Sequence, residues 1–222
     1  MTEELVKRYV PHLRYDKNEP FFPEAIGYTV FRESGWSSSC RLFIRVKPEE
    51  TVLEYAFYYD FDIQHLYDLE HVFVKINKSG EIVGVLGSFH GKFLNNLIPG
   101  ETAFEGTHVI EYVQPGKHAF MPNPHYFQLA PDRNENCNLY AGSDGLLIAP
   151  MFEGRLSTEE AFDEKVKQYI RHHFSFEPFW EFDVKSVGQK RTEGILMPWE
   201  ELYELIVKRI DEWKSKIDRE TV

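Results

Sequence analysis

Four carboxylates and two imidazoles occupy the twelve residues from Asp60 to His71. This stretch follows a strongly apolar segment and precedes one with alternating apolar residues, so the acids are concentrated between two expected strands. Carboxylate oxygens combined with an imidazole nitrogen form a ligand set that divalent cations bind in proteins. We therefore predict a metal site in this stretch, and its predicted ligands are Asp60, Asp62, His65, Asp68 and Glu70.

The ligand types favour a hard cation at this site. Mg²⁺, Mn²⁺ and Ca²⁺ prefer oxygen ligands and fit the set best, whereas Zn²⁺ and Fe²⁺ remain compatible with it. An alternative interpretation needs no metal: the acids form a loop that caps a strand, with His65 and Asp68 hydrogen-bonded to the backbone. The spacing of the residues leaves both interpretations open.

Alternation along the following strand places one of these acids on the core side. In the expected strand 70–76, Glu70 shares its face with the apolar residues at every second position. Asp68 has the same parity, and His65 lies in the connection before it. Burying a carboxylate is costly unless it is paired, protonated or bound to a cation, so this placement requires a polar partner for Glu70.

Two more histidines lie close to glycines, where a ligand or another backbone segment can approach. His90 follows the expected strand 81–87, and His118 lies in the turn after the expected strand 108–113. If these strands are neighbours, both imidazoles can reach the same end of the sheet as His65. We therefore predict His90 and His118 as catalytic general acid/base groups or additional ligands. The alternative for each is a hydrogen-bonded structural histidine.

The pattern His65-x-x-Asp68-x-Glu70, with two acids shortly before it, resembles the heptapeptide region of the necrosis- and ethylene-inducing (NPP1-like) proteins. In that family, a Gly-His-x-His-Asp-Trp-Glu segment precedes a β-strand. A similar Asp-Trp-Glu segment followed by a Val-rich strand occurs in Vps62-related proteins. The resemblance covers roughly residues 9–120, and it includes the Vps62-like segments 11–23 and 109–119.

This resemblance implies a central β-sandwich with helices and a divalent metal bound at one end of it. The ligands that it implies are His65, Asp68, Glu70 and an upstream acid, which is either Asp60 or Asp62.

The sequence also departs from the family pattern. The secretion signal and the disulfides typical of the toxins are missing, so the resemblance implies the metal site but not the plant-membrane toxicity. Within the heptapeptide, Gln64 replaces Gly, Tyr67 replaces the second His, and Leu69 replaces Trp.

Strands dominate the first half of the chain. β-branched and aromatic residues concentrate in short runs separated by turn residues, which is typical of antiparallel β structure. Proline and glycine make most of residues 121–150 a loop. The expected strands are 28–32, 41–46, 52–59, 70–76, 81–87 and 108–113, with a hairpin turn at 77–80.

Two amphipathic helices are expected in the last third. The first begins near Ser157 or Thr158, either of which can cap it. The second carries an apolar stripe that can pack on the sheet or form a homo-oligomer interface. Consecutive strands followed by helices indicate one mainly β domain. Its expected parts are an antiparallel β-sandwich over about 1–150 and peripheral α-helices over about 157–173 and 198–218, the second a C-terminal amphipathic helix.

Composition narrows the class of partner. With 25 Lys+Arg and 36 Asp+Glu the net charge is −11, which argues against nucleic acid and favours metal ions or small molecules. No apolar run is long enough to span a membrane. The first residues lack the apolar core of a signal peptide, and Cys40 and Cys137 are expected to be reduced thiols. We therefore predict a cytoplasmic protein.

Two functions are consistent with these features. The chain lacks dinucleotide-binding, P-loop and nucleophile-elbow motifs, and its serine run 37–39 is not such an elbow. One function is a metal-dependent hydrolase, in which the metal activates water and His90 or His118 transfers protons. The alternative is a metal-stabilised module that binds a sugar or lipid head group without turnover.

Overall fold

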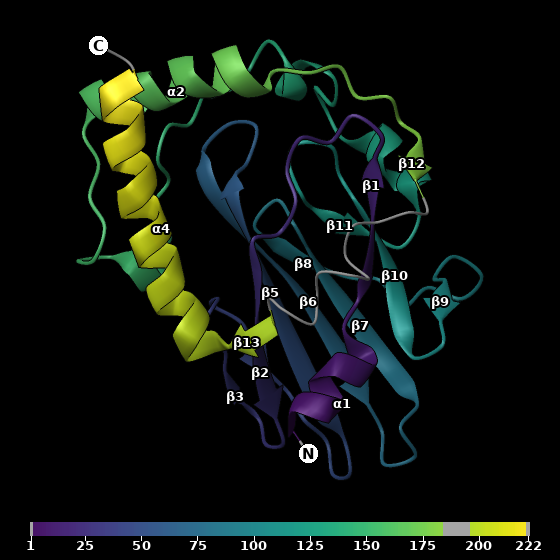
Figure 1. Ribbon diagram of the computed structural model, residues 1–222. Helices are drawn as coiled ribbons and strands as arrows, with labels where there is room; N and C mark the ends of the chain where they lie inside the picture. The colour runs from purple at the N-terminus through teal and green to yellow at the C-terminus, as the bar shows by residue number, and fades with distance from the viewer. Residues whose placement is uncertain (1, 184–195, 221–222) are drawn as a thin grey trace.

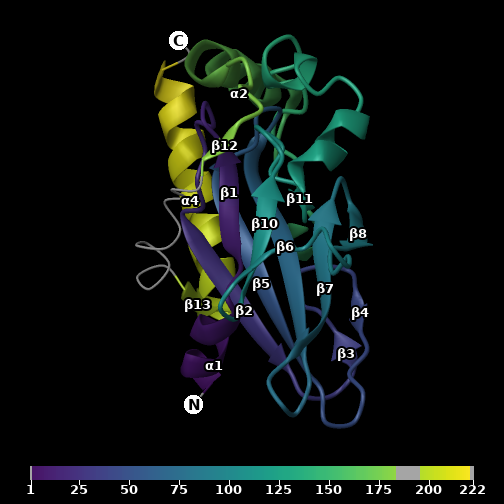
Figure 2. The same ribbon diagram turned by 90° about the vertical axis from the view of Figure 1, so that its right-hand side faces the viewer.

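Two β-sheets form the centre of the molecule, with helices at their edges and at one end (Figures 1 and 2). The computed structural model describes residues 2–183 and 196–220. The larger sheet has the strand order β13-β2-β5-β6-β7-β8, and its pairs are antiparallel except for β13 and β2. Its strands are β13 (Leu196–Pro198), β2 (Ala25–Phe31), β5 (Thr51–Phe61), β6 (Leu66–Ile76), β7 (Ile82–Phe89) and β8 (Lys92–Asn95).

The smaller sheet is assembled from distant parts of the chain. Strand β1 runs parallel to β10, with His12 opposite Ile110, while β12 and β11 flank this pair in antiparallel orientation. Strand β9 pairs with β10 outside this path. The strands of this sheet are β1 (His12–Asp16), β9 (Phe104–Glu105), β10 (His108–Val113), β11 (Phe120–Met121) and β12 (Phe182–Asp183).

The prediction of a mainly β chain with peripheral helices is confirmed, but the sheets are of mixed orientation. Both parallel pairs, β1 with β10 and β13 with β2, join segments that are far apart in sequence. A short hairpin forces neighbouring strands to be antiparallel, whereas a long connection leaves their direction free. The wholly antiparallel arrangement was therefore wrong for these two pairs.

The core lies between the two sheets. On β5, the alternate residues Tyr55, Phe57 and Tyr59 face the smaller sheet and are completely or almost completely buried. The ring of Phe57 packs on Phe120 of β11, with 5.3 Å between the centroids. Inner-face residues of β6 lie directly opposite these aromatic residues, so Asp68 pairs with Tyr59 and Glu70 with Phe57. Both acids consequently lie on the inner face of the larger sheet.

Other elements cover the outer face of the larger sheet. Helix α4 (Trp199–Glu220) packs on β2, where Gly27 leaves room for Leu202; a Cβ atom at Gly27 would lie 2.6 Å from the Leu202 side chain. Strands β3 (Gly35–Trp36) and β4 (Phe43–Ile44) form a small hairpin over β5 and β6. Buried Ile44 of this hairpin packs on Val52 and Phe73.

Both late helices form where the periodicity predicts them. Helix α4 uses its apolar stripe within the chain, because Leu202, Ile206 and Ile210 are fully buried; oligomerisation through it remains a prediction. Helix α2 runs over Glu160–Phe174. Its expected cap is wrong: Glu159 occupies the cap position, and Thr158 Oγ1 instead donates a hydrogen bond to Asp163 at 2.6 Å.

The remaining differences between the expected and the observed elements concern where strands and helices begin and end. The expected strand 41–46 is reduced to the two residues of β4, and β6 begins at Leu66 rather than at Glu70. Helix α1 (Thr2–Tyr9) precedes β1. The irregular region 121–150 and its end contain the short 3₁₀ helices η1 (Pro124–Leu129), η2 (Glu135–Cys137) and η3 (Pro150–Phe152).

Among the described residues, no helix combines the length and the apolar character needed to cross a membrane. Cys40 and Cys137 are free cysteines, and Cys137 is buried.

Candidate metal site at the β5–β6 turn

The turn that joins β5 to β6 is tied to two other loops by backbone hydrogen bonds. Ile63 donates to the carbonyl of Gly116 at 2.8 Å and accepts from Gly142 at 2.8 Å. Leu66 donates to the carbonyl of Gly145 at 2.8 Å. These bonds hold the acids of the turn against the segment that carries Lys117 and His118.

Asp62 lies at the centre of this region and is 1% exposed. Its Oδ1 atom accepts hydrogen bonds from the backbone of Gln64 at 2.6 Å and from Lys117 Nζ at 2.7 Å. Burial by itself raises the Asp62 pKa, but the positive charge of Lys117, followed by those of His65 and His118, outweighs it and lowers the pKa. Asp62 is therefore an ionised carboxylate in a buried environment.

His118 is clamped between two carboxylates and is fully buried. Its Nδ1 lies 3.0 Å from Asp68 Oδ2, and its Nε2 lies 3.6 Å from Glu19 Oε1. The ring stacks on Tyr59 at a centroid distance of 3.9 Å. Burial opposes the charged form, but hydrogen bonding and charge from Asp68 and Glu19 raise the His118 pKa to about 10. At 3.6 Å, the contact between His118 Nε2 and Glu19 is an ion pair just beyond hydrogen-bond distance.

His65 has the orientation of a metal-binding histidine. Its Nδ1 contacts the carbonyl oxygen of Tyr67 at 2.7 Å, so the backbone fixes both the ring and its tautomer. The opposite nitrogen, Nε2, lies 3.7 Å from Asp62 Oδ1. In metal sites, one ring nitrogen is usually held by such a carbonyl while the other binds the ion.

Glu70 lies further along β6, beside Ser88 of β7. The Ser88 hydroxyl donates a short hydrogen bond to Glu70 Oε2. Burial, followed by the negative charge of Asp68, raises the Glu70 pKa to about 8, although the Ser88 bond acts in the opposite direction. Burial of Glu70 therefore favours its protonated form.

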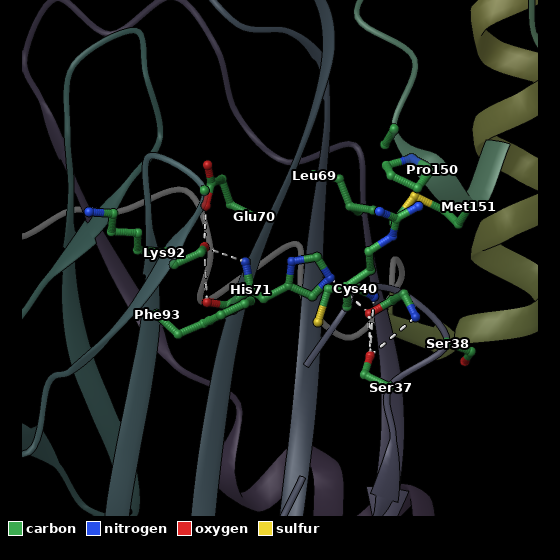
Figure 3. Close-up of a pocket in the computed structure, with 15 residues that line it drawn as sticks. Ser37, Ser38, Cys40, Leu69, Glu70, His71, Lys92, Phe93, Pro150 and Met151 are labelled. Carbon is green, nitrogen blue, oxygen red and sulfur yellow. Dashed lines mark hydrogen bonds between the residues drawn. The ribbon is translucent and has the colours of Figure 1, made fainter. Parts of the chain in front are cut away.

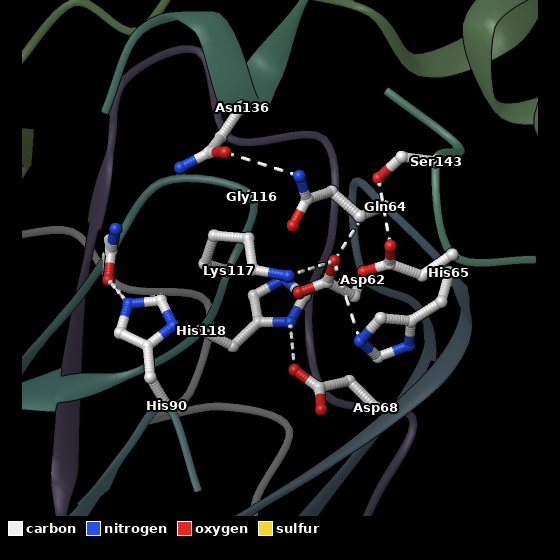
Figure 4. A network of polar contacts seen from close by, with 12 residues as sticks. Asp62, Gln64, His65, Asp68, His90, Gly116, Lys117, His118, Asn136 and Ser143 are labelled. Carbon is white, nitrogen blue, oxygen red and sulfur yellow. Dashed lines mark hydrogen bonds and ion pairs between the residues drawn. The ribbon is translucent and has the colours of Figure 1, made fainter. Parts of the chain in front are cut away.

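The structure brings together only part of the predicted set (Figure 4). One ligand atom each of Asp62, Asp68 and His118 lies within 4.8 Å of the others. His65 faces this cluster through Asp62, and Glu70 interacts with it electrostatically.

Asp60 and His90 have other partners. The Arg209 guanidinium of α4 forms a two-pronged ion pair with Asp60, with 3.1 Å between Nε and Oδ1. Of the two upstream acids, the cluster therefore contains Asp62 and not Asp60. His90 Nε2 contacts Gln114 Oε1 at 2.8 Å rather than any of the acids.

Two members of the site were missed in the sequence. Lys117 directly precedes His118, and a positive charge next to a predicted site residue was the signal that could have identified it. Glu19 gave no comparable signal: it lies almost a hundred residues from its partner Gly116, whose backbone N–H donates to Glu19 Oε2 at 2.8 Å. Such long-range pairs do not appear as a local spacing.

Unusual backbone conformations are concentrated at this end of the sheet. Tyr67, His90 and His118 all have positive φ, at 52°, 48° and 54°. A non-glycine residue in this region is strained and is held there by its surroundings, and such residues cluster at functional sites.

A pocket of about 580 Å³ opens beside Glu70 (Figure 3). Its walls are rich in hydrogen-bonding and charged groups, and Leu69, Phe93 and Met151 add apolar surface. The polar lining includes Ser37, Ser38, Ser39, Arg41, Glu70, His71, Ser88 and Lys92.

No protein-family model and no curated protein matches this chain. Several solved structures are similar to this chain. The structure described as NLPPya in complex with glucosamine is 16% identical, with a TM-score of 0.40, and the match covers 54% of this chain and 65% of that one. The corresponding complex with mannosamine has 16% identity and a TM-score of 0.39 over the same shares.

A third similar structure is the Necrosis and Ethylene inducing Protein 2 from the causal agent of cocoa's Witches Broom disease. It is 20% identical with a TM-score of 0.38, and the match covers 68% of this chain and 87% of that one. The name of this third structure is that of the family that the His65–Glu70 pattern resembles. The chain spans about two thirds of the length of the first two structures. With these TM-scores, no ligand, site residue or activity is transferred from them.

Proposed function

We propose that this protein is a binding module that holds a divalent cation at the β5–β6 turn. Asp62, His65 and Asp68 are the proposed ligands, with Glu70 and His118 completing the surroundings. The observation that carries this proposal is the orientation of His65, whose Nδ1 is held by a backbone carbonyl while its Nε2 faces Asp62 at 3.7 Å. In metal sites, a ligating histidine is commonly held in this way by its other ring nitrogen.

The chemistry of the surrounding groups fits a cation. Asp62 and Asp68 are buried carboxylates, and such groups need a counter-charge. Lys117 and the charged His118 neutralise Asp62 and Asp68 within the chain. A bound divalent cation would supply the positive charge that Lys117 and His118 now provide.

Binding without turnover fits the geometry better than hydrolysis. A proton-transferring histidine needs a pKa near the working pH and access to the substrate. His118 is fully buried between carboxylates, and its pKa is about 10. His90 is bonded to Gln114 instead of facing the cluster. These contacts support binding over proton transfer by either of the predicted catalytic histidines.

The ligand class that we propose is a small hydroxyl-rich molecule such as a sugar head group. The pocket beside Glu70 offers serine hydroxyls, an imidazole and charged side chains, which are groups that bind hydroxyls. We include in this proposal the cytoplasmic location expected from the sequence, because both cysteines are free thiols, as expected in a reducing compartment.

Metal content tests the first half of the proposal. The untagged protein, purified without added metal, is analysed beside the Asp68→Asn/Glu70→Gln double variant and an Asp132→Asn control at an exposed loop position. We expect about one equivalent of metal in the parent and the control, and none in the double variant. Calorimetric titration with Mg²⁺, Mn²⁺ and Ca²⁺ identifies the ion. An empty parent that also fails to bind added ions would contradict the proposal.

Glucosamine, a small amino sugar with several hydroxyl groups, is a suitable first probe of the pocket, because the pocket lining offers serine hydroxyls and charged side chains. We expect binding that strengthens when the metal is present. A phosphoesterase panel on the metal-loaded protein tests the alternative function. Turnover that disappears in the double variant would replace the binding module by a hydrolase.

A further inference from the structure

The outer face of the larger sheet carries a second cluster of ligand-type side chains. It is formed by Glu54 of β5, His71 of β6, and Cys40 of the segment before β4. Glu54 lies opposite Phe73 and His71 opposite Ala56, so both side chains point away from the inner-face acids. This cluster therefore has a different location from the site at the β5–β6 turn.

The three side chains are close enough to share one ion. Cys40 Sγ, a carboxylate oxygen of Glu54 and an imidazole nitrogen of His71 all lie within 4.8 Å of one another. The sulfur is 3.9 Å from Glu54 Oε1. Glu54 and His71 are almost completely buried, at 1% and 4% exposure, so their positions are fixed by packing.

The Glu54 carboxylate is only half satisfied by the protein. Its Oε1 accepts hydrogen bonds from the Ser37 and Ser39 hydroxyls at 2.6 and 2.5 Å. Its Oε2 is buried and has no hydrogen-bond partner among the described residues. A buried carboxylate oxygen without a partner is costly, and a cation is one group that can supply the missing interaction.

We propose that Cys40, Glu54 and His71 form a second metal site, which takes a borderline-soft cation of the zinc class. A thiolate and an imidazole favour zinc, whereas the oxygen-rich cluster on the inner face favours harder ions. The serine hydroxyls on Glu54 Oε1 act as the outer hydrogen bonds that orient a metal-binding carboxylate. Cys40 and His71 both line the 580 Å³ pocket, so water or a small ligand can reach the fourth position (Figure 3).

A serine nucleophile is the competing interpretation of the same residues. Ser39 Oγ lies 2.8 Å from His71 Nε2, which is a suitable distance for a nucleophile and its base. In a catalytic triad, however, the carboxylate orients the histidine. Here Glu54 contacts the serine hydroxyls instead, and it does not orient the imidazole. The arrangement consequently favours a metal over a nucleophile.

Cobalt substitution tests this site separately from the inner one. Co²⁺ bound to a thiolate has a sulfur-to-metal charge-transfer absorption, and the inner cluster contains no cysteine. We expect this absorption when Co²⁺ is added to the reduced full-length protein, and Zn²⁺ should abolish it. It should disappear in Cys40→Ser and persist in Cys137→Ser and in the inner-site variant Asp68→Asn/Glu70→Gln. His71→Gln should weaken the apparent affinity by about tenfold or more.

An alkylation experiment on the unmodified chain covers the case in which a variant does not fold. Cys40 is partly exposed and Cys137 is buried, so labelling of each thiol can be mapped by mass spectrometry. We expect Zn²⁺ to slow alkylation of Cys40 by about tenfold or more. Absence of the cobalt absorption, or Cys40 labelling that Zn²⁺ does not change, would overturn the proposal.

Discussion

Glu70 and His71 are consecutive residues whose side chains point to opposite faces of one sheet, and a single hydroxyl contacts both residues. Ser88 Oγ accepts a hydrogen bond from the His71 backbone N–H at 2.7 Å and donates one to Glu70 Oε2. Glu70 faces the acids at the β5–β6 turn, whereas His71 faces Glu54 and Cys40. Ser88 therefore links the two proposed metal sites through the backbone of β6.

Replacing this hydroxyl should affect both faces. In Ser88→Ala, Glu70 loses its hydrogen-bond donor and the His71 N–H loses its acceptor, so we expect a loss of about 1 to 3 kcal/mol in the free energy of unfolding. Urea denaturation measures it. The matched control is Ser143→Ala, because the Ser143 hydroxyl contacts Asp144 at an exposed position. That change should stay within about 0.5 kcal/mol. Equal effects of the two substitutions would contradict the linking role of Ser88.

The two acids before the turn should respond differently to neutralisation. Asp62→Asn removes a proposed ligand, and we expect metal binding to be lost. Asp60→Asn weakens the ion pair with Arg209 of α4, so we expect normal metal content and a loss of about 1 kcal/mol in stability. Metal analysis and thermal unfolding of both variants distinguish these outcomes. Loss of metal in Asp60→Asn would mean that the cluster is assigned to the wrong acid.

Lys117 should compete with a bound cation. Its ammonium group lies 2.7 Å from Asp62 Oδ1. It therefore neutralises a carboxylate that a metal ion would bind. Lys117→Met keeps the aliphatic chain and removes the charge. We expect metal affinity to rise by about tenfold while the metal-free protein loses about 3 kcal/mol, because Asp62 then lacks its counter-charge. Calorimetry and melting with and without metal measure the two effects. Lys167→Met, at a surface pair with Glu164, should change neither.

Gly116 should tolerate a side chain poorly. Its φ is +68°, and a Cβ atom there would lie 2.8 Å from Ile63 Cγ2, at the turn that carries the acids. Gly116→Ala combines backbone strain with this clash, so we expect a loss of about 2 to 4 kcal/mol and weaker metal binding. Gly106→Ala is the control, because Gly106 also has positive φ but no atom within 4 Å of a Cβ. It should cost about 1 kcal/mol. Equal losses would mean that packing against Ile63 is unimportant.

Glu111 should make stability depend on pH. Burial raises its pKa from 4.5 to about 8, and the Asn96 hydrogen bond only partly opposes this shift. The folded state thus retains a proton that the unfolded chain has released, so stability is full below about pH 4.5 and falls as pH rises toward 8.

Glu111→Gln replaces the titrating carboxyl group by an amide that does not titrate. We expect the stability of the Gln variant relative to the parent to increase by on the order of 4 kcal/mol between about pH 5 and pH 9. Because the comparison is made between two chains at each pH, the raised pKa values of Glu70 and His118 contribute equally to both. A difference that stays constant with pH would show that Glu111 is already ionised in the folded protein.

Local patterns in the sequence were sufficient for most of the long strands, the two late helices and the face of Glu70. Alternation along a strand and the 3.6-residue period of a helix are short-range properties, so they can be read within a few residues. They placed Glu70 and Asp68 on the core side of β6 and predicted the apolar stripe of α4, which the structure packs within the chain.

The tertiary structure decided which side chains meet. Asp60 and Asp62 are two residues apart and have the same parity, yet Asp60 pairs with Arg209, which is 149 residues away. Asp62 comes after the end of β5, where alternation no longer applies, and turns toward Lys117. Glu19, Glu54 and Cys40 likewise acquired their roles from contacts between distant segments. The ion-pair and hydrogen-bond partners of a side chain depend on which segments pack together. The spacing of neighbouring residues in the sequence does not determine that packing.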